Sequence, residues 1–167
     1  MIKVGIGQDS HRIIEGPGTK RLLLGGVGFE EGFYLDGNSD ADVVLHSVTN
    51  GISGITGIPV LGAQADEMCR NGITDSRYYL ERALQDLERM DYQVAHISIS
   101  IECRKPRIMP KVDEMRGSIA EIVSLTCCDV AVTATSGENL SDFGKGLGIQ
   151  SICAVTARVR EKKIDHQ

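Results

Sequence analysis

The amino-acid sequence predicts an α/β fold: a single-domain α/β sandwich in which one mixed β-sheet is packed by helices. Strand-like and helix-like segments are intermixed, in the order strand, strand, helix, loop, helix, strand, helix, strand, strand, which favours one sheet with helices against it. The 167 residues are enough for one sizeable core. No repeat or linker divides them, so we expect residues 1–167 to form one domain, with a flexible tail over about 160–167.

The N-terminal half contains two predicted strands, a helix and a long loop. Residues 2–6 alternate between apolar and other side chains, and residues 21–29 follow a turn-forming segment. Ser39, with Asp42 three residues later, resembles a capping box that opens a helix. Residues 57–74 have no clear period, so we expect a loop with at most one short helical turn. Apolar residues of the helix recur at helical spacing: Val44, Leu45, Val48, Ile52 and Ile55.

The C-terminal half is predicted to contain two helices and three strands. The first helix starts near Asp75 or Ser76, where an apolar stripe begins. Residues 93–104 alternate isoleucines with polar residues, which is typical of a strand. The remaining elements are a helix over 110–124 and strands over 129–136 and 150–159.

Composition and charge exclude some classes of function. Hydrophobic residues make up 41% and charged residues 25%, as in ordinary soluble globular proteins. The net charge is −5 and no long basic run occurs, which argues against nucleic acid as a partner. No apolar stretch approaches the ~20 residues that span a bilayer, so we expect no membrane association.

The cysteines and the N-terminus indicate a cytoplasmic protein. The start of the sequence, MIKVGIGQDSHR, lacks the long apolar centre of a signal peptide. The five cysteines are odd in number and form no C-x-x-C pair. We interpret them as reduced thiols that mostly fill the core.

Three residues form a candidate metal site. Asp9 and His11 are two apart after a predicted strand, and residues i and i+2 of extended backbone point to the same side. His46 lies on the first predicted helix, one turn after Asp42. One carboxylate and two imidazoles would leave a fourth position open, as in catalytic zinc sites. The spacing alone also fits a surface aspartate and an unrelated histidine.

Two further segments suit phosphate groups. Residues 36–42 join a strand to the helix start, where backbone N–H groups favour anions. The alternative is that this segment is only a helix cap.

Residues 133–150 bring Thr135, Ser136 and Glu138 together with Lys145, which lies between glycines. Hydroxyls, flexible glycines and an ammonium suit phosphate oxygens, although the glycine and lysine spacing fits neither a P-loop nor a dinucleotide fingerprint. The alternative is a glycine-rich connection between strands.

One dense basic patch is present. Arg104, Lys105 and Arg107 surround Pro106 at the end of a predicted strand. Charge runs of this kind are usually solvated loops, and the sequence leaves that alternative open.

Taken together and in order, these segments resemble the 2-C-methyl-D-erythritol 2,4-cyclodiphosphate synthase family. The segment GQDSHR resembles the family's motif G-x-D-x-H, and LLLGGVGF resembles the family's strand with a Gly-Gly pair. The segment NSDADVVLH resembles the family's motif H-S-D-x-D-x-x-x-H. TDS matches a central D-S at a helix start, and KPRIMP matches a basic P-K segment. TATSGENLSDFGKGLGI resembles K-A-T-T-x-E-x-L-G-F-x-G-R-G-E-G-I. The match covers nearly the whole sequence with little insertion.

The resemblance implies a specific reaction. Such enzymes take 4-diphosphocytidyl-2-C-methyl-D-erythritol 2-phosphate, a cytidine diphosphate-linked substrate, whose 2-phosphate attacks its own β-phosphate while CMP leaves. The matching metal ligands are Asp9, His11 and His46, usually for zinc, and Glu138 for a Mg²⁺ or Mn²⁺ ion that bridges the diphosphate. Family members are homotrimers with active sites between subunits, so we expect strands 93–104 and 150–159 to contribute to subunit contacts.

The resemblance also implies which residues face the substrate. Asn38 and Ser136 take the positions of the two groups that polarise phosphates, and we expect both to act catalytically. The full set of implied substrate-binding residues is Asn38, Ser39, Leu61, Gly62, Asp66, Lys105, Pro106, Ile108, Met109, Thr135, Ser136, Gly137, Glu138 and Lys145.

Several positions depart from the family pattern. The family's histidine before S-D is Asn38, whose amide donates without charge. A family threonine becomes Ser136, and an arginine becomes Lys145, which keeps charge but loses bidentate geometry. The family's acidic loop, G-D-I-G…F-P-D-x-D, corresponds to VLGAQADEMC in this sequence. The position of the family's sugar-binding aspartate falls near Val60, so that role is unassigned. Asp66 and Glu67 could replace part of the acidic loop.

Three functions remain open at the level of sequence. The first is an active synthase with a remodelled sugar pocket. The second is a trimeric binding module for phosphorylated isoprenoid intermediates, suggested by Asn38 and the altered loop. The third is a metal-dependent phosphohydrolase on the same scaffold. Retention of the three metal ligands and Glu138 favours chemistry over binding alone. We assign no role to His166, in the polar tail.

Overall fold

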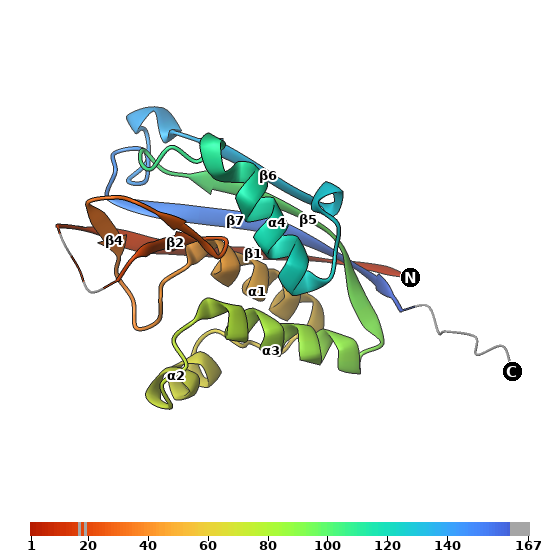
Figure 1. Cartoon of the computed structure of the whole chain (residues 1–167). Coiled ribbons are helices and arrows are strands. Elements are labelled where there is room, and N and C mark those ends of the chain that lie inside the picture. The colour runs from red at the N-terminus through yellow and green to blue at the C-terminus, as the bar shows by residue number, and fades with distance from the viewer. Residues whose placement is uncertain (17, 19, 161–167) are drawn as a thin grey trace, which may run out of the picture.

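The framework of the computed structural model is a five-stranded mixed sheet (Figure 1). The structure describes every residue except 17, 19 and 161–167, so nearly all of the predicted tail, with His166, lies outside the described residues. The strands are β1 (Ile2–Glu15), β4 (Phe33–Leu35), β5 (Tyr92–Glu102), β6 (Val130–Thr135) and β7 (Gly148–Val159). They lie in the order β4-β1-β7-β5-β6, with β5 and β6 parallel and the other neighbours antiparallel.

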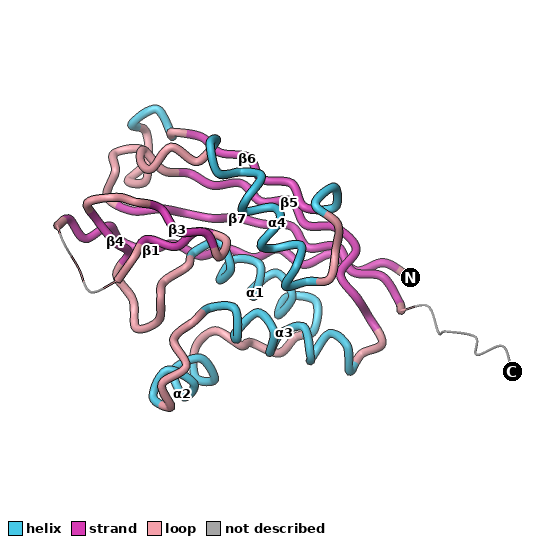
Figure 2. Tube along the Cα trace, viewed as in Figure 1, coloured by secondary structure: helices cyan, strands magenta, loops and turns pink. Residues whose placement is uncertain are grey.

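Helices cover one face of this sheet (Figures 1 and 2). They are α1 (Val43–Thr56), α2 (Ala63–Arg70), α3 (Ser76–Arg89) and α4 (Val112–Val123). Helix α1 packs on β1 and β7, α4 packs on β6, and α3 packs on α1. The inward-facing isoleucines and valines of the strands join the helices' apolar stripes in one buried core. The predicted α/β fold with one mixed, helix-packed sheet is therefore confirmed.

The opposite face of the sheet is not covered by any helix of the described residues. Alternate side chains of β1 point to this face, and the exposed fractions of Ile2, Val4 and Ile6 are 68%, 62% and 74%. Ile152 of β7, 42% exposed, lies on the same face because it pairs with Gln8 in the register of the two strands. A row of aliphatic side chains is thus left exposed in the middle of the sheet.

Close contact between α1 and β1 depends on glycine. A Cβ atom on Gly7 would lie 1.9 Å from the carbonyl oxygen of Ser47, and one on Gly5 would lie 2.0 Å from that of Gly51. Only residues without side chains allow the helix backbone to approach the strand this closely. This close approach brings His46, on α1, towards the far half of β1.

The start of α1 differs from the predicted capping box. The cap is Asp42 itself, whose buried carboxylate accepts hydrogen bonds from the backbone N–H groups of Val44 and Leu45. The same carboxylate accepts from the N–H groups of Gly25 and Gly26. Burial raises the pKa of Asp42, and these backbone donors oppose the rise. One residue therefore both caps the helix and ties it to a neighbouring turn.

Three other predictions about secondary structure were wrong or incomplete. The strand predicted over 2–6 continues to Glu15, because polar residues of its second half pair with β7. The strand predicted over 21–29 is a hairpin of β2 (Leu22–Leu24) and β3 (Val27–Phe29), turned at glycines with positive φ. The loop predicted over 57–74 contains α2, in which Ala65 alone is buried, so its apolar pattern is too sparse to read.

The remaining predicted elements are confirmed as α1, α3, β5, α4, β6 and β7, with ends shifted by a few residues. Strand β4 was not predicted because three residues are too few to show a period. Short 3₁₀ turns occur at Met109–Lys111, Cys127–Asp129 and Gly137–Asn139. None of the helices in the described part of the protein has the length and apolarity needed to cross a bilayer.

Candidate functional site

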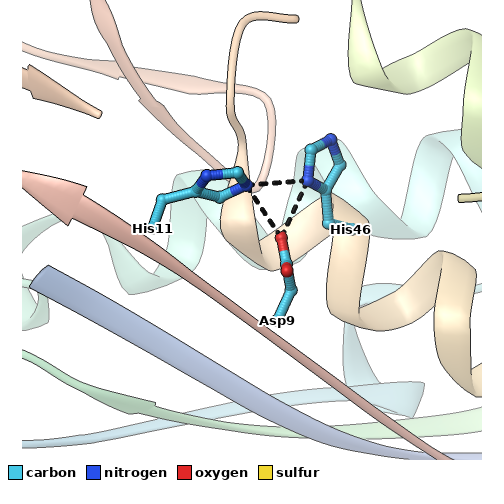
Figure 3. Close-up of side chains that lie close together, drawn as sticks. All are labelled: Asp9, His11 and His46. Atoms are coloured by element: carbon cyan, nitrogen blue, oxygen red, sulfur yellow. Dashed lines mark hydrogen bonds and ion pairs between the residues drawn. The ribbon is translucent and has the colours of Figure 1, made fainter. Parts of the chain in front are cut away.

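Asp9, His11 and His46 meet at one point, as their spacing suggests (Figure 3). Asp9 and His11 project from the same side of β1, and His46 projects from the first turn of α1. The Oδ2 atom of Asp9 lies 2.8 Å from Nδ1 of His46 and 3.0 Å from Nε2 of His11. The two imidazole nitrogens are 3.3 Å apart. The three side chains therefore form one cluster.

This donor set fits a divalent cation. Ligands about 2.0–2.1 Å from a tetrahedral zinc ion lie about 3.3 Å from one another, close to the observed separations. The cluster is half-buried, with exposed fractions of 24%, 21% and 8% for the side chains of Asp9, His11 and His46. Three protein ligands would leave a fourth position for a substrate oxygen. The cluster is thus a candidate catalytic metal site.

The charges inside the cluster are strongly coupled. Burial disfavours the charged form of Asp9, but hydrogen bonds and charges of His11 and His46 outweigh it and lower the pKa of Asp9 to about 2. Burial likewise opposes protonation of His11, but Asp9 and the backbone carbonyl of Asp36 outweigh it and raise the pKa of His11. Without a cation, a proton on His11 thus compensates the buried carboxylate of Asp9.

Two serines and an aspartate lie behind His46, a contact that the sequence did not predict. Its Nε2 atom, on the side away from Asp9, is 2.8 Å from Oγ of Ser76 and 3.5 Å from Oγ of Ser39. The carboxylate of Asp40 accepts hydrogen bonds from both Ser76 Oγ and the Ser76 backbone N–H. The D-S of TDS is visible in the sequence as a motif, but its contact with the metal site depends on the packing of α3 against α1.

The loop carrying Asn38 lies beside the cluster. A Cβ on Gly37 would be 3.3 Å from Cε1 of His11. Asn38 is exposed and makes no side-chain hydrogen bond within the described residues, whereas Ser39 is buried. Lys20, which the sequence did not indicate, donates to the carbonyl oxygens of Gly37 and Ser39, the latter at 2.6 Å. Because Asp42 caps α1, Asn38 is free to meet a ligand.

The second predicted phosphate segment leaves the end of β6. Gly137 and Glu138 both adopt positive φ, +67° and +49°, and Ser136 Oγ lies 3.3 Å from the carboxylate of Glu138. Glu138 is exposed and is not part of the Asp9–His11–His46 cluster. Ser141, on the same loop, donates to Glu102 at the end of β5. The loop thus presents hydroxyl, carboxylate and backbone groups to solvent.

Several of the predicted substrate-binding residues line one pocket between the ends of β5 and β6. Its volume is about 380 Å³. The lining residues are Cys103, Arg104, Pro106, Arg107, Ile108, Met109, Pro110, Ala134, Thr135 and Ser136. Burial and the charge of Glu102 raise the pKa of Cys103 to about 12, so its thiol is neutral at physiological pH. The pocket is mainly apolar, and its polar lining residues include Arg104, Thr135 and Ser136.

Other predicted residues lie outside this pocket. Lys105 forms an ion pair with Glu15 at 2.6 Å, and Lys145 forms an exposed one with Asp142 at 3.4 Å. Leu61, Gly62 and Asp66 lie at the start of α2, together with Val60, which is fully buried. Asp66 is exposed and forms no hydrogen bond or ion pair with the other predicted site residues among those described.

Comparisons with known proteins agree with this geometry. A family model described as the YgbB family matches residues 2–158. The 2-C-methyl-D-erythritol 2,4-cyclodiphosphate synthase of Chlamydia caviae is 44% identical over 155 residues, covering 92% of this chain and 88% of the relative. The bifunctional IspDF of Campylobacter jejuni superimposes with a TM-score of 0.87 at 25% identity, over 96% of this chain and 43% of that one.

A further solved structure, the CDP complex of IspF from Plasmodium falciparum, has a TM-score of 0.80 at 21% identity, over 96% of this chain and 97% of that one. At this identity the likeness concerns the fold. The family match, by contrast, extends over almost the whole chain and is joined by a relative of 44% identity. The chain therefore belongs to the YgbB family, which confirms its resemblance to the 2-C-methyl-D-erythritol 2,4-cyclodiphosphate synthases.

Proposed function

We propose that this protein catalyses the metal-dependent cyclisation of 4-diphosphocytidyl-2-C-methyl-D-erythritol 2-phosphate to 2-C-methyl-D-erythritol 2,4-cyclodiphosphate, with release of CMP. It is then a phosphorus–oxygen lyase of non-mevalonate isoprenoid precursor biosynthesis. The observation that carries this proposal is the Asp9–His11–His46 cluster, built between β1 and α1 in a member of the YgbB family.

The proposed reaction needs positioning more than acid or base chemistry. An oxygen of the 2-phosphate forms a bond to the β-phosphorus. The bond from that phosphorus to the oxygen bridging it to the α-phosphate breaks, and CMP leaves with the electron pair. Both reacting groups belong to one molecule, so holding them in a near-attack geometry supplies much of the rate.

The site residues have distinct roles in this proposal. Asp9, His11 and His46 would hold a divalent cation, and zinc suits a carboxylate and two imidazoles. Glu138 would hold a Mg²⁺ or Mn²⁺ ion. Such cations would supply positive charge to the phosphate oxygens. Asn38 and Ser136 donate hydrogen bonds to the phosphates as neutral groups.

The pocket between β5 and β6 takes the cytidine of the substrate in this proposal. Its volume of about 380 Å³ and its apolar walls suit one flat base with part of its ribose. Thr135 and Ser136 line this pocket, and their hydroxyls would face the diphosphate that leaves the nucleoside. The CDP bound in the Plasmodium falciparum relative supports a cytidine diphosphate-linked substrate.

A homotrimer completes the proposed site. One row of paired residues crosses β1, β7, β5 and β6, through Ser10, Gln150, Glu102 and Thr135. Three strand spacings, about 14 Å, therefore separate β1, which carries two residues of the metal cluster, from the end of β6. The resemblance implies active sites between subunits, so we infer that the pocket of a neighbouring copy serves this metal cluster. The aliphatic row of β1 and β7 supplies the apolar surface for the contact between copies.

We infer a cytoplasmic setting for the same activity. All five cysteines are free, and the exposed pair of Cys127 and Cys128 would be prone to oxidation outside a reducing compartment. The net charge of −5 suits neither nucleic acid nor an anionic membrane surface as a partner. The partners in this proposal are the small-molecule substrate and two further copies of the protein.

Product analysis tests the proposal. The protein is incubated with the cytidyl substrate and Zn²⁺ plus Mg²⁺, and products are identified by phosphorus NMR and mass spectrometry. Cyclic diphosphate together with CMP is the expected result. A ring-free phosphorylated product would instead identify a phosphohydrolase, and binding without turnover would identify a binding module; either result overturns the proposed cyclisation.

A further inference from the structure

We propose that Ser76 and Asp40 are positioning residues that orient His46 so that its Nδ1 lone pair faces Asp9 and His11. The proposal rests on the metal centre of the proposed function and extends it to two residues outside the ligand set. It is carried by a buried series of contacts, in which His46 is 6% exposed and Ser76 is fully buried.

The direction of the hydrogen bonds follows from the chemistry of the groups. An ionised carboxylate can only accept, so the single hydroxyl proton of Ser76 is donated to Asp40. The oxygen of Ser76 then has only lone pairs to offer to Nε2 of His46, 2.8 Å away. The proton on Nε2 is therefore donated to Ser76, and a neutral His46 keeps its lone pair on Nδ1.

The second nitrogen of the ring faces the proposed cation. Nδ1 of His46 lies 2.8 Å from Asp9 and 3.3 Å from Nε2 of His11, so this atom belongs to the ligand cluster and Nε2 does not. A neutral imidazole coordinates through its unprotonated nitrogen, and an acceptor on the other nitrogen fixes which one that is. The Ser76–Asp40 pair supplies this acceptor together with a negative charge.

Asp40 and Ser76 are themselves held from both sides. Asp40 donates its backbone N–H to the carbonyl of Thr74 at 2.8 Å, and its carboxylate accepts from the backbone N–H groups of Ser76 and Asp42. Ser76 is the first residue of α3, directly after its cap Asp75. The start of α3 and the segment before α1 are thus joined at the metal site, and this assigns a role to the D-S of the TDS motif.

Zinc affinity tests this proposal independently of turnover. Zn²⁺ is titrated against a competing chelator for the wild type and for Ser76→Ala, which should bind Zn²⁺ about 10–100-fold more weakly, as loss of a partner behind a metal ligand does elsewhere. Ser47→Ala is the matched control. Ser47 is as buried as Ser76 and is adjacent to His46 in sequence, but its hydroxyl forms hydrogen bonds with Ser151 and with the carbonyl of Val44 instead of with His46. It should bind Zn²⁺ as the wild type does.

Two further measurements separate positioning from a general loss of structure. In the zinc-loaded wild type, the Nε2 proton of His46 should give an exchange-protected NMR signal, which Ser76→Ala should lose. Asp40→Asn keeps an acceptor but removes the charge, and should weaken Zn²⁺ binding less than Ser76→Ala. Equal Zn²⁺ affinity of Ser76→Ala and wild type would overturn the positioning role alone. A wild type that binds no divalent cation would overturn the metal centre and the positioning role with it.

Discussion

At the scale of single residues, the site is governed by one carboxylate between two imidazoles. Asp9 Oδ2 lies 3.0 Å from Nε2 of His11 and 2.8 Å from Nδ1 of His46. The lowered pKa of Asp9 and the raised pKa of His11 mean that a proton on His11 balances the negative charge of Asp9. A divalent cation would replace the proton, so metal affinity should fall as the pH decreases.

The first prediction concerns the stability of the metal-free protein. Asp9 has a folded pKa of about 2 and an ordinary value of 3.8, so its stabilisation is present above pH 3.8 and is lost as the pH falls through about 2. The raised pKa of His11 gives stabilisation that is present below 6.5 and is lost as the pH rises through the folded value. Both stabilising contributions are therefore fully present together between pH 3.8 and pH 6.5.

Asp9→Asn should therefore reduce the free energy of unfolding near pH 5.5. The fall in the pKa of Asp9 from 3.8 to about 2 corresponds to about 2 kcal/mol. The reduction should become smaller towards pH 8.5, because His11 loses its stabilising proton as the pH rises through its raised pKa. Urea denaturation with a chelator present measures both values. A reduction that grows between these two pH values would contradict the proposed coupling.

The second prediction concerns the phosphate donors. Neither Asn38 nor Ser136 is an acid or base near neutral pH, so each acts as an oriented neutral donor if the protein is active. Asn38→Ala or Ser136→Ala should lower turnover about 10²–10³-fold, with unchanged Zn²⁺ affinity, because neither belongs to the metal cluster. Asn38→His should support turnover at least as well as the wild type. Undiminished turnover of Asn38→Ala would remove this residue from the mechanism.

At the scale of elements, the site depends on how closely α1 approaches β1. Gly5 and Gly7 on the strand admit the helix backbone, and Gly51 on the helix lies against Val155 of β7, where a Cβ would be 2.7 Å from its side chain. Gly51 thus serves the packing of α1 against β7. Any displacement of α1 moves His46 relative to the two ligands on β1.

The third prediction is that Gly7→Ala separates helix from strand. The new Cβ would lie 1.9 Å from the Ser47 carbonyl and 2.4 Å from the Gly51 nitrogen, so we expect about 1–3 kcal/mol less stability together with weaker Zn²⁺ binding. Gly54→Ala is the control, because its Cβ would meet nothing closer than 3.5 Å and alanine favours helix by about 1 kcal/mol. Thermal unfolding and Zn²⁺ titration measure both effects, and equal behaviour of the two variants would contradict this account.

At the scale of the whole molecule, the helices of the described residues cover one face of the sheet and leave its other face uncovered (Figure 1). The uncovered face exposes aliphatic side chains of β1 and β7, and the polar side chains of β5 lie on the same face. An apolar row in the centre of a sheet is typical of a surface that another subunit covers. The homotrimer that we propose uses this face.

The fourth prediction follows from that surface. The wild type should have three times the 18.1 kDa mass of the monomer in light scattering. Ile6→Asp should shift it towards the monomer, because a carboxylate on the aliphatic row would be buried without a partner. Ile58→Asp, at a residue 39% exposed in the loop after α1, should leave the mass unchanged. A monomeric wild type would contradict the proposed assembly.

The sequence by itself determined the fold class, most of the elements and the three members of the metal cluster. Periodicity was sufficient where strands and helices bury one regular face, as in β5 and α3. It failed for α2 and β4, where few residues are buried or the element is too short. Asp9 and His11 could be paired from sequence because i and i+2 share one side of a strand.

Only the tertiary structure decided which distant residues act on one another. The hydrogen bonds that join the cap residue Asp42 to the turn at Gly25 and Gly26 are one example. The contact of Ser76 and Asp40 with His46 depends on the packing of α3 against α1, which no local pattern encodes. Local spacing fixes directions within one element, whereas contacts between residues far apart in the sequence are set by how whole elements pack.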